Sequence, residues 1–126
     1  MTSPFGATKY IDLETFRRSG TGVRTPIWFA EDTDRTLYAY SRADAGKVKR
    51  IRADGAVRIA ACTMRGTITG PWVDADARIV SGEEAATGMQ LLNRKYWPWK
   101  TIGDFFGHLR TAQPRAVIAI RVRSRA

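Results

Sequence analysis

Short segments in which apolar and polar residues alternate recur along this 126-residue chain, and they constrain its fold more than any other feature. Successive side chains of a β-strand point to opposite faces, so the alternation predicts strands with one buried face. Turn residues, such as those at 19–22, separate the segments and predict antiparallel neighbours. The predicted strands are residues 9–16, 23–29, 37–41, 56–64, 72–80 and 116–122.

Three segments depart from the alternation and predict helices. Asp44 is a suitable N-cap for the first, and Ser81-Gly82-Glu83-Glu84 is a capping box for the second, which Pro98 ends. The predicted helices are residues 43–52, the segment between that capping box and Pro98, and residues 102–109.

Six short antiparallel strands with short helices fit a barrel, because closure removes exposed sheet edges. The length fits a single domain, residues 1–126, that buries its own core. The first residues lack the basic end and the apolar run of a signal peptide, and no apolar stretch approaches the roughly 20 residues that span a bilayer. We therefore expect a mainly β protein that is soluble and cytoplasmic.

The formal net charge of +9 predicts an anionic partner: a nucleic acid, an acidic membrane surface or a phosphorylated small molecule. Catalytic chemistry by side chains finds little support. Cys62 and His108 are the only residues of their types, which excludes an internal disulfide and argues against a Cys/His zinc site. Cys62 fits a buried structural thiol, and Asp74 and Asp76 fit the solvent face of their strand.

The strongest local feature is the basic segment Ser41–Arg52, in which a strand ends, small residues form a turn and a helix begins. Backbone N–H groups and the positive end of the helix dipole point to one place there. Lys47, Lys49, Arg50 and Arg52 add four cations. The segment therefore suits a phosphate, although a solvated basic helix face is the alternative.

A second feature is Val23–Phe29, where Pro26 lies within a predicted strand. Proline removes a ladder donor and is normally confined to an edge strand or a bulge, which leaves backbone groups free to meet a ligand. Arg24, Pro26 and Trp28 share one face of it, and ordinary aromatic packing at an edge is the alternative. The aromatic residues at 96–106 suit a pocket, a subunit interface or the core.

Taken together, these segments resemble the pyridoxamine 5′-phosphate oxidase-like split-barrel superfamily and, within it, the deazaflavin (F420)-dependent oxidoreductases. The resemblance covers about Lys9 to Val122, and Trp97-Pro98-Trp99 departs from it by extending the segment after Tyr96. The residues that carry it are Lys9-Tyr10-Ile11-Asp12-Leu13-Glu14-Thr15-Phe16, Thr25-Pro26-Ile27-Trp28-Phe29, Gly46-Lys47-Val48-Lys49-Arg50-Ile51-Arg52, Ala60-Ala61-Cys62, Arg65-Gly66, Gly70-Pro71 and Arg94-Lys95-Tyr96.

The resemblance implies a six-stranded antiparallel split β-barrel that forms a homodimer, with two cofactor sites in clefts between the subunits. It implies that Lys47–Arg50 holds the cofactor phosphate and that Arg24–Trp28 lies along the ring system. The partner subunit would close the cleft with aromatic residues near Trp97. The cofactor-binding residues it implies are Arg24, Thr25, Pro26, Trp28, Tyr40, Ser41, Lys47, Lys49, Arg50, Ala61, Cys62 and Trp97.

The implied function is that of an oxidoreductase in which the cofactor transfers a hydride and the protein orients it, which requires no catalytic side chain. Coenzyme F420 carries a longer anionic tail than FMN, and Arg24, Lys49 and Arg52 provide cations beyond a single phosphate site. An FMN-binding oxidoreductase on the same fold remains an alternative. A basic nucleic-acid-binding barrel is a third hypothesis, although the cations are not interleaved with aromatic residues along one strand face.

Overall fold

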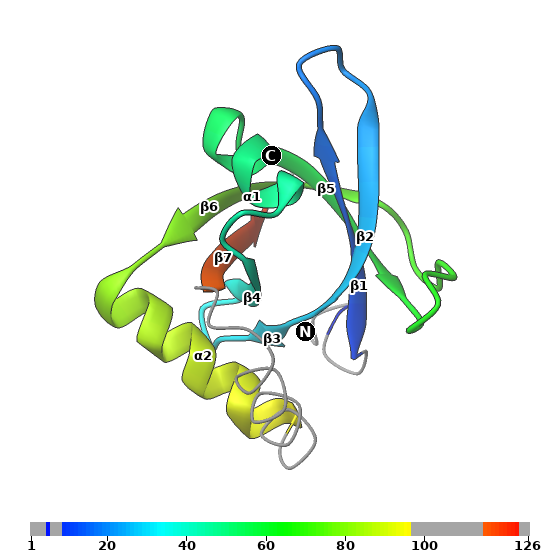
Figure 1. The fold of residues 1–126 in the computed structure, drawn as a ribbon. Helices are drawn as coiled ribbons and strands as arrows, with labels where there is room; N and C mark the ends of the chain where they lie inside the picture. The colour runs from blue at the N-terminus through cyan, green and yellow to red at the C-terminus, as the bar shows by residue number, and fades with distance from the viewer. Residues whose placement is uncertain (1–4, 6–8, 97–114, 124–126) are drawn as a thin grey trace.

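The computed structural model describes residue 5, residues 9–96 and residues 115–123, and within them the chain forms an antiparallel sheet and two helices (Figure 1). The sheet order is β2-β1-β5-β6-β7-β4-β3. The elements are β1 (Tyr10–Phe16), β2 (Gly22–Trp28), β3 (Ala30–Glu31), β4 (Leu37–Arg42), α1 (Gly46–Ala53), β5 (Ala56–Cys62), β6 (Val73–Val80), α2 (Gly82–Tyr96) and β7 (Arg115–Val122).

The sheet curls into a half-barrel of seven strands, so the prediction of six strands was wrong by one. The additional strand is the two-residue β3, which only the buried Phe29 separates from β2. β2 pairs with β1, whereas β3 pairs with β4. β2 and β3 are thus the two edge strands of the sheet, although they follow each other directly in the chain. The segment that contains them passes from one edge of the curled sheet to the other.

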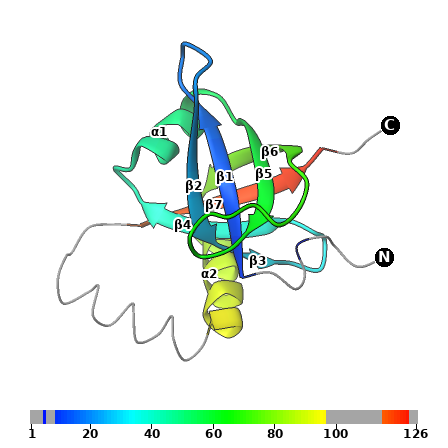
Figure 2. The same cartoon turned by 90° about the vertical axis from the view of Figure 1, so that its right-hand side faces the viewer.

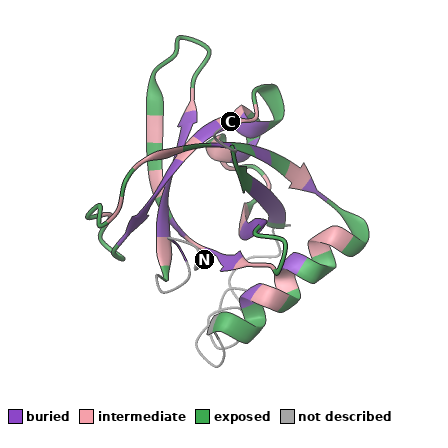
Figure 3. Cartoon of the chain, turned by 180° about the vertical axis from the view of Figure 1, so that it is seen from behind, coloured by how far each residue is buried: buried purple, intermediate pink, exposed green. Residues whose placement is uncertain are grey.

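The alternation predicted the interior correctly. Alternate residues of the strands point inward and form one apolar core, and Figure 3 shows the buried stretches following the strands. This core includes Ile11, Leu13, Leu37, Ala39, Val57, Ile59, Ala61, Ala75, Ala77, Ile118 and Ile120, with Val73 and Ile79 packed against it. Asp74 and Asp76 are exposed, as predicted.

Helix α2 covers the outer face of β4 and β7, so these two strands are buried on both faces. Tyr38 and Val117 of that outer face pack with Met89 of the helix. The approach is close at Gly88, where an added Cβ would lie 2.8 Å from Cδ1 of Tyr38. Figure 2 shows α2 below the sheet and α1 near its upper end, beside the β1–β2 hairpin. Neither helix of the described residues is long and apolar enough to cross a membrane.

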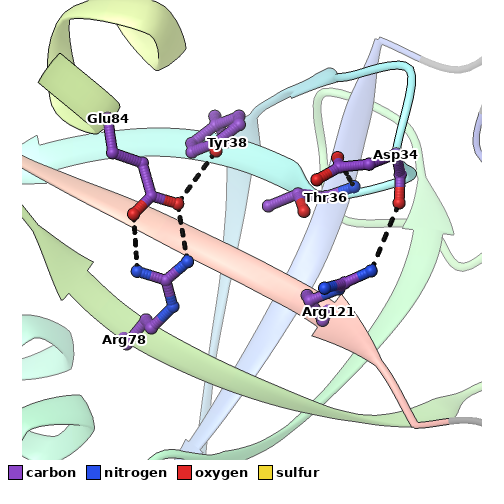
Figure 4. A network of polar contacts seen from close by, with 6 residues as sticks. All are labelled: Asp34, Thr36, Tyr38, Arg78, Glu84 and Arg121. Atoms are coloured by element: carbon purple, nitrogen blue, oxygen red, sulfur yellow. Dashed lines mark hydrogen bonds and ion pairs between the residues drawn. The ribbon is translucent and has the colours of Figure 1, made fainter.

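A polar network fixes the start of α2 to the sheet (Figure 4). Glu84 accepts a hydrogen bond from the Tyr38 hydroxyl at 3.0 Å and two from the Arg78 guanidinium at 2.7 and 2.6 Å. Nearby, Arg121 reaches the backbone oxygen of Asp34 at 3.5 Å. The Glu84 carboxylate is thus directed at the sheet rather than back at the helix start, which corrects the role that the capping box predicted for it.

The start of α1 also differs from the prediction. The helix begins at Gly46, its N-cap is Ala45, and no side chain caps it. Asp44 instead accepts hydrogen bonds from Arg42 at 3.2 and 3.0 Å. The helix predicted at 102–109 lies outside the described residues.

Candidate functional site

A cavity of about 350 Å³ lies between the edge strand β2, the end of β4 and the first turn of α1. We call it the β2–α1 cavity. It brings together five of the residues assigned to a cofactor by sequence, from three separate segments of the chain. Its lining residues are Tyr10, Pro26, Ile27, Trp28, Tyr40, Ser41 and Lys47, of which Pro26, Trp28, Tyr40, Ser41 and Lys47 were predicted.

The aromatic wall of this cavity depends on the pairing of β1 with β2. Tyr10 and Trp28 are directly opposite in the register, and their rings meet edge to face with centroids 6.3 Å apart. Pro26 lies in the same strand at the edge of the sheet, the position in a sheet where proline is best tolerated. The result is an aromatic wall against which a planar ring system can pack.

Lys47 supplies the charge of this cavity. It is half-buried, and among the described residues it forms no ion pair. Burial lowers the pKa of Lys47, and the neighbouring Arg50 lowers it further. Both effects penalise the ammonium ion, so an anion bound beside it would remove an unfavourable interaction.

Arg50 is held in place by a contact with β1. Its Nε donates a hydrogen bond to Thr15 Oγ1 at 2.6 Å. Its guanidinium also lies over Gly46, where an added Cβ would be 2.7 Å from Nη1. Arg50 is therefore directed at the start of α1, next to Lys47, while Lys49 is exposed on the same helix.

Arg24 belongs to a different environment. Its Nε lies 3.2 Å from Oε2 of the buried Glu14, and its guanidinium carbon is 4.8 Å from the centroid of the Trp72 ring. Arg58 lies 3.6 Å from the other Glu14 oxygen and 5.4 Å from the same ring centroid. We call Glu14, Arg24, Arg58 and Trp72 the Glu14 cluster. The charge of Arg24 is thus balanced within the fold. Thr25 is half-buried next to it on β2.

Sequence reasoning missed Asp12. It is 5% exposed, and its Oδ1 has no hydrogen-bond partner among the described residues. Burial raises the pKa of Asp12, and the charge of Arg24 and a backbone hydrogen bond from Thr25 oppose that shift. The only signal was its place on the polar face of β1, which predicts exposure rather than burial.

Ala61 and Cys62 are not among the residues that line the β2–α1 cavity. They lie on β5, and β1 separates that strand from β2. Ala61 belongs to the barrel core, and Cys62 is 3% exposed. Burial raises the pKa of the Cys62 thiol to about 11, with a further contribution from Asp12, which suits a structural thiol. Trp97 lies outside the described residues, and no metal-binding group of His, Cys, Asp or Glu occurs within them.

No protein-family model matches the chain, and no curated protein matches it in sequence. Solved structures match its fold. HutZ, the heme storage protein of Vibrio cholerae, is 12% identical with a TM-score of 0.71, covering 94% of this chain and 84% of that one. An F420 reductase is 20% identical with a TM-score of 0.61, covering 98% and 97%. A candidate pyridoxamine 5′-phosphate oxidase from Listeria innocua is 12% identical with a TM-score of 0.63, covering 92% and 85%. The chain therefore has the split-barrel fold of pyridoxamine 5′-phosphate oxidase-like proteins.

Proposed function

We propose that this protein binds a flavin-type coenzyme in the β2–α1 cavity and that the coenzyme is the deazaflavin F420. The observation that carries the proposal is Lys47. A half-buried cation without an acidic partner among the described residues lines a cavity whose other wall is aromatic. A ligand that combines an anion with a planar ring system satisfies both walls.

The residues present fit such a ligand. Lys47 and Arg50 would hold the phosphate at the start of α1, where backbone N–H groups also point outward. Trp28 and Pro26 would lie along the ring system, and Ser41 offers a hydroxyl at the end of β4. Thr25 and Lys49 are neighbours of the proposed site on β2 and α1, whereas Ala61 and Cys62 lie on β5 and outside this cavity.

A bound deazaflavin would supply hydride transfer to an organic substrate, so the proposed function is that of an oxidoreductase. The chain itself would bind and orient the coenzyme. Neither Cys62, buried and with a raised pKa, nor the exposed Asp74 and Asp76 suits covalent or acid–base chemistry at this cavity.

A homodimer belongs to the same proposal. The β2–α1 cavity lies at an edge strand, and a second copy would complete it with residues near Trp97. Light scattering tests the dimer by measuring the mass of the particle. A mass of about 28 kDa supports it, whether this mass is constant or is reached from about 14 kDa when the cofactor is added. A 14 kDa particle that binds the cofactor at full affinity contradicts it.

The preference for F420 over FMN rests on charge beyond the phosphate. Arg24 is balanced by Glu14, so it contributes less than its sequence position predicted. Lys49 and Arg52 are exposed on α1 and form no ion pair among the described residues. Several such cations raise the local concentration of a polyanion, and added salt screens them.

Fluorescence titration with F420 and with FMN, at low and moderate ionic strength, tests the proposal. We expect F420 to bind at least about fivefold tighter than FMN at low salt, and this ratio to fall as salt is added. Tighter binding of FMN would transfer the proposal to an FMN-dependent oxidoreductase. Binding of neither coenzyme, together with salt-dependent binding of single-stranded nucleic acid, would contradict it.

A further inference from the structure

A cavity of about 480 Å³ lies where β3 and the turn after it pack against the last turn of α2 (Figure 1). We call it the α2 cavity. Glu31 and Asp32 line it from the strand side, and Arg94 and Lys95 line it from the helix. Its volume falls within the range of about 300–1,000 Å³ that is typical of small-molecule sites. The α2 cavity thus offers a small ligand both signs of charge.

The opposite charges that line the α2 cavity are not joined by direct contact. In the described part of the chain, no ion pair connects its two acidic residues to its two basic ones. The charge of Glu31 nevertheless acts to raise the pKa of Lys95, so the two sides of the cavity are close enough to interact. The cavity therefore holds acids and bases near each other with space for a ligand.

Glu31 and Arg94 are the charges that a ligand can use. Glu31 is half-buried and Arg94 is exposed, and neither forms a hydrogen bond or ion pair through its side chain within residues 5, 9–96 and 115–123. Asp32 already accepts hydrogen bonds from the backbone N and the hydroxyl of the next residue, at 2.7 and 3.4 Å. The ammonium of Lys95 lies 3.7 Å from the centroid of the Phe29 ring.

Most of the remaining described lining of the α2 cavity is apolar. Phe5, Ala30 and Leu91 line it, and the Phe5 ring meets Phe29 edge to face with centroids 6.3 Å apart. Ala30 and the fully buried Leu92 form a cluster against which Leu91 packs. Packing therefore holds these apolar groups in place before any ligand binds.

A ligand with a single charge satisfies only one side of this cavity. An anion beside Arg94 would be repelled by the two carboxylates, and a cation beside Glu31 would be repelled by the two basic groups. An uncharged ligand would leave both charges without a partner. A zwitterion instead forms charge-assisted hydrogen bonds at both sides and adds no net charge to the cavity.

We propose that the α2 cavity binds a free amino acid with an apolar side chain. Its ammonium group would lie beside Glu31, its carboxylate beside the planar guanidinium of Arg94, and its side chain on Phe5 and Leu91. An α-amino acid carries both charges on one carbon, which suits charges that belong to two elements in contact, β3 and α2. In the described lining this site shares no residue with the β2–α1 cavity, so it is a second binding function.

Three ligands of similar shape test the proposal: phenylalanine, 2-phenylethylamine, which lacks the carboxylate, and 3-phenylpropionate, which lacks the ammonium group. NMR titration of the protein without coenzyme measures the three affinities. We expect phenylalanine to bind at least about fivefold tighter than either analogue. The net charge of +9 favours the anion at long range, so a preference for the zwitterion has to come from local charges. Absence of phenylalanine binding, or equally tight binding of 3-phenylpropionate, would overturn the proposal.

Two substitutions should weaken binding in complementary patterns. Arg94→Gln should weaken phenylalanine and 3-phenylpropionate at least about threefold and should not weaken 2-phenylethylamine. Glu31→Gln should weaken phenylalanine and 2-phenylethylamine at least about threefold and should not weaken 3-phenylpropionate. If either variant loses affinity for all three ligands equally, its side chain does not recognise one charge of the ligand, and the assigned orientation is wrong.

Arg18→Gln and Glu83→Gln are the matched controls, because they make the same changes in net charge. Arg18 is exposed in the turn between β1 and β2, at the end of the molecule opposite α2 in Figure 1. Glu83 is exposed and lies eleven positions before Arg94, roughly 16 Å along the helix. Both variants should retain the affinities of the wild type within about 1.5-fold. Losses equal to those of Arg94→Gln and Glu31→Gln would reduce the effect to net charge and overturn the site.

The source of the zwitterion and the link to the proposed function are separated by two further titrations. The dipeptide Phe-Phe carries the same two charges farther apart, so tighter binding of this dipeptide than of phenylalanine would overturn the assignment to a free amino acid. F420 is titrated into the same Glu31→Gln and Arg94→Gln variants, and we expect its affinity to stay within about twofold of wild type. A failure of F420 to bind the wild-type protein contradicts the proposed function alone, whereas a failure of phenylalanine contradicts the α2 site alone.

Discussion

The two basic regions of this barrel use the same types of side chain in opposite ways. In the Glu14 cluster, Arg24 and Arg58 contact one buried carboxylate and the face of Trp72. On α1, Lys47 is partly buried with no acidic partner among the described residues. A cation whose counter-ion is built into the fold stabilises the structure, whereas a desolvated cation without one is poised to bind an anion.

This difference decides which cations belong to the proposed site. From the sequence, Arg24 and Lys47 are both candidates for the cofactor site, although the segment around Lys47 is the stronger feature. In the structure the guanidinium of Arg24 is turned toward Glu14 and Trp72, and only Lys47 lines the β2–α1 cavity. Net charge alone therefore overstates the number of cations available to a ligand.

The largest expected effect is that of Lys47→Ala on coenzyme binding. A charge-assisted contact to phosphate contributes about 1.5–3 kcal/mol, so the affinity for F420 should fall roughly tenfold to a hundredfold. The free energy of unfolding should not fall, because the substitution removes a cation that burial disfavours. Fluorescence titration and urea denaturation measure the two quantities.

Arg24→Ala is the matched variant for that experiment, since it also removes one cation. It should show the opposite pattern, with a lower midpoint of unfolding and an affinity for F420 within about threefold of wild type. An equal loss of affinity in both variants would show that the two regions do not differ as described.

The next largest effect is that of Glu14→Gln, in the Glu14 cluster, on the free energy of unfolding. Glu14→Gln keeps the shape of the buried side chain but removes the charge shared by Arg24 and Arg58. We expect a loss of about 1–3 kcal/mol in the free energy of unfolding, from weakened hydrogen bonds to a buried charged group. Thermal and urea denaturation measure it.

Asp74→Asn provides the control, because Asp74 also contacts Arg58, at 3.8 Å, but its side chain is 67% exposed. It should change stability by less than about 0.5 kcal/mol. If the two substitutions destabilise the protein equally, burial of Glu14 is not what gives the cluster its structural role.

A smaller effect is expected from Gly46→Ala. The new Cβ would lie 2.7 Å from Nη1 of Arg50 and would displace the guanidinium from the start of α1. The affinity for F420 should fall about threefold, or about 0.7 kcal/mol, while stability stays equal or rises because alanine favours helix. Thr15→Val, which removes the acceptor of the 2.6 Å hydrogen bond from Arg50 Nε, should lower affinity similarly but should also lower stability. Unchanged affinity in both variants would remove Arg50 from the proposed site.

The sequence predicted the inner faces of the strands, because the alternation of apolar and polar residues within one strand is enough to identify its buried face. Ile11 and Leu13 alternate with polar neighbours and point into one core, as do the inward residues of β5 and β6. β3 escaped prediction, since two residues carry no periodicity and its pairing with β4 is set by the crossing at Phe29. The contacts of Glu84 were also not predicted, because Tyr38 and Arg78 come near its carboxylate only once the sheet has formed.

Five of the seven residues that line the β2–α1 cavity were named from the sequence, for a similar reason. Pro26 and Lys47 are marked by their local context, a strand edge and a helix start, and the fold brings them to one cavity. The partner of Arg24 depends on register, because Glu14 faces it across the β1–β2 hairpin. The burial of Asp12 and Glu14 depends on tertiary contacts, and nothing in the alternation of residues 9–16 distinguishes them from solvent-facing carboxylates.

The smallest expected effect is the pH dependence that Lys95 contributes, which extends the comparison to a third cation. Its Nζ lies 3.7 Å from the centroid of the Phe29 ring. The residue as a whole is exposed, but burial of its ammonium group lowers the pKa of Lys95 to about 8. The charge of Glu31 opposes this shift. The ring face also attracts the ammonium, so it opposes the shift as well. Because the unfolded chain holds this proton up to its ordinary value of 10.5, it binds more protons than the folded chain between about pH 8 and 10.5, and stability should rise slightly with pH in that window. Lys95→Met should remove this rise, and the exposed Lys49→Met should not, as measured by thermal midpoints at pH 7.5, 9 and 10.5. If stability rises equally in wild type and in Lys95→Met, the folded structure does not disfavour the charge of Lys95, and this prediction is wrong.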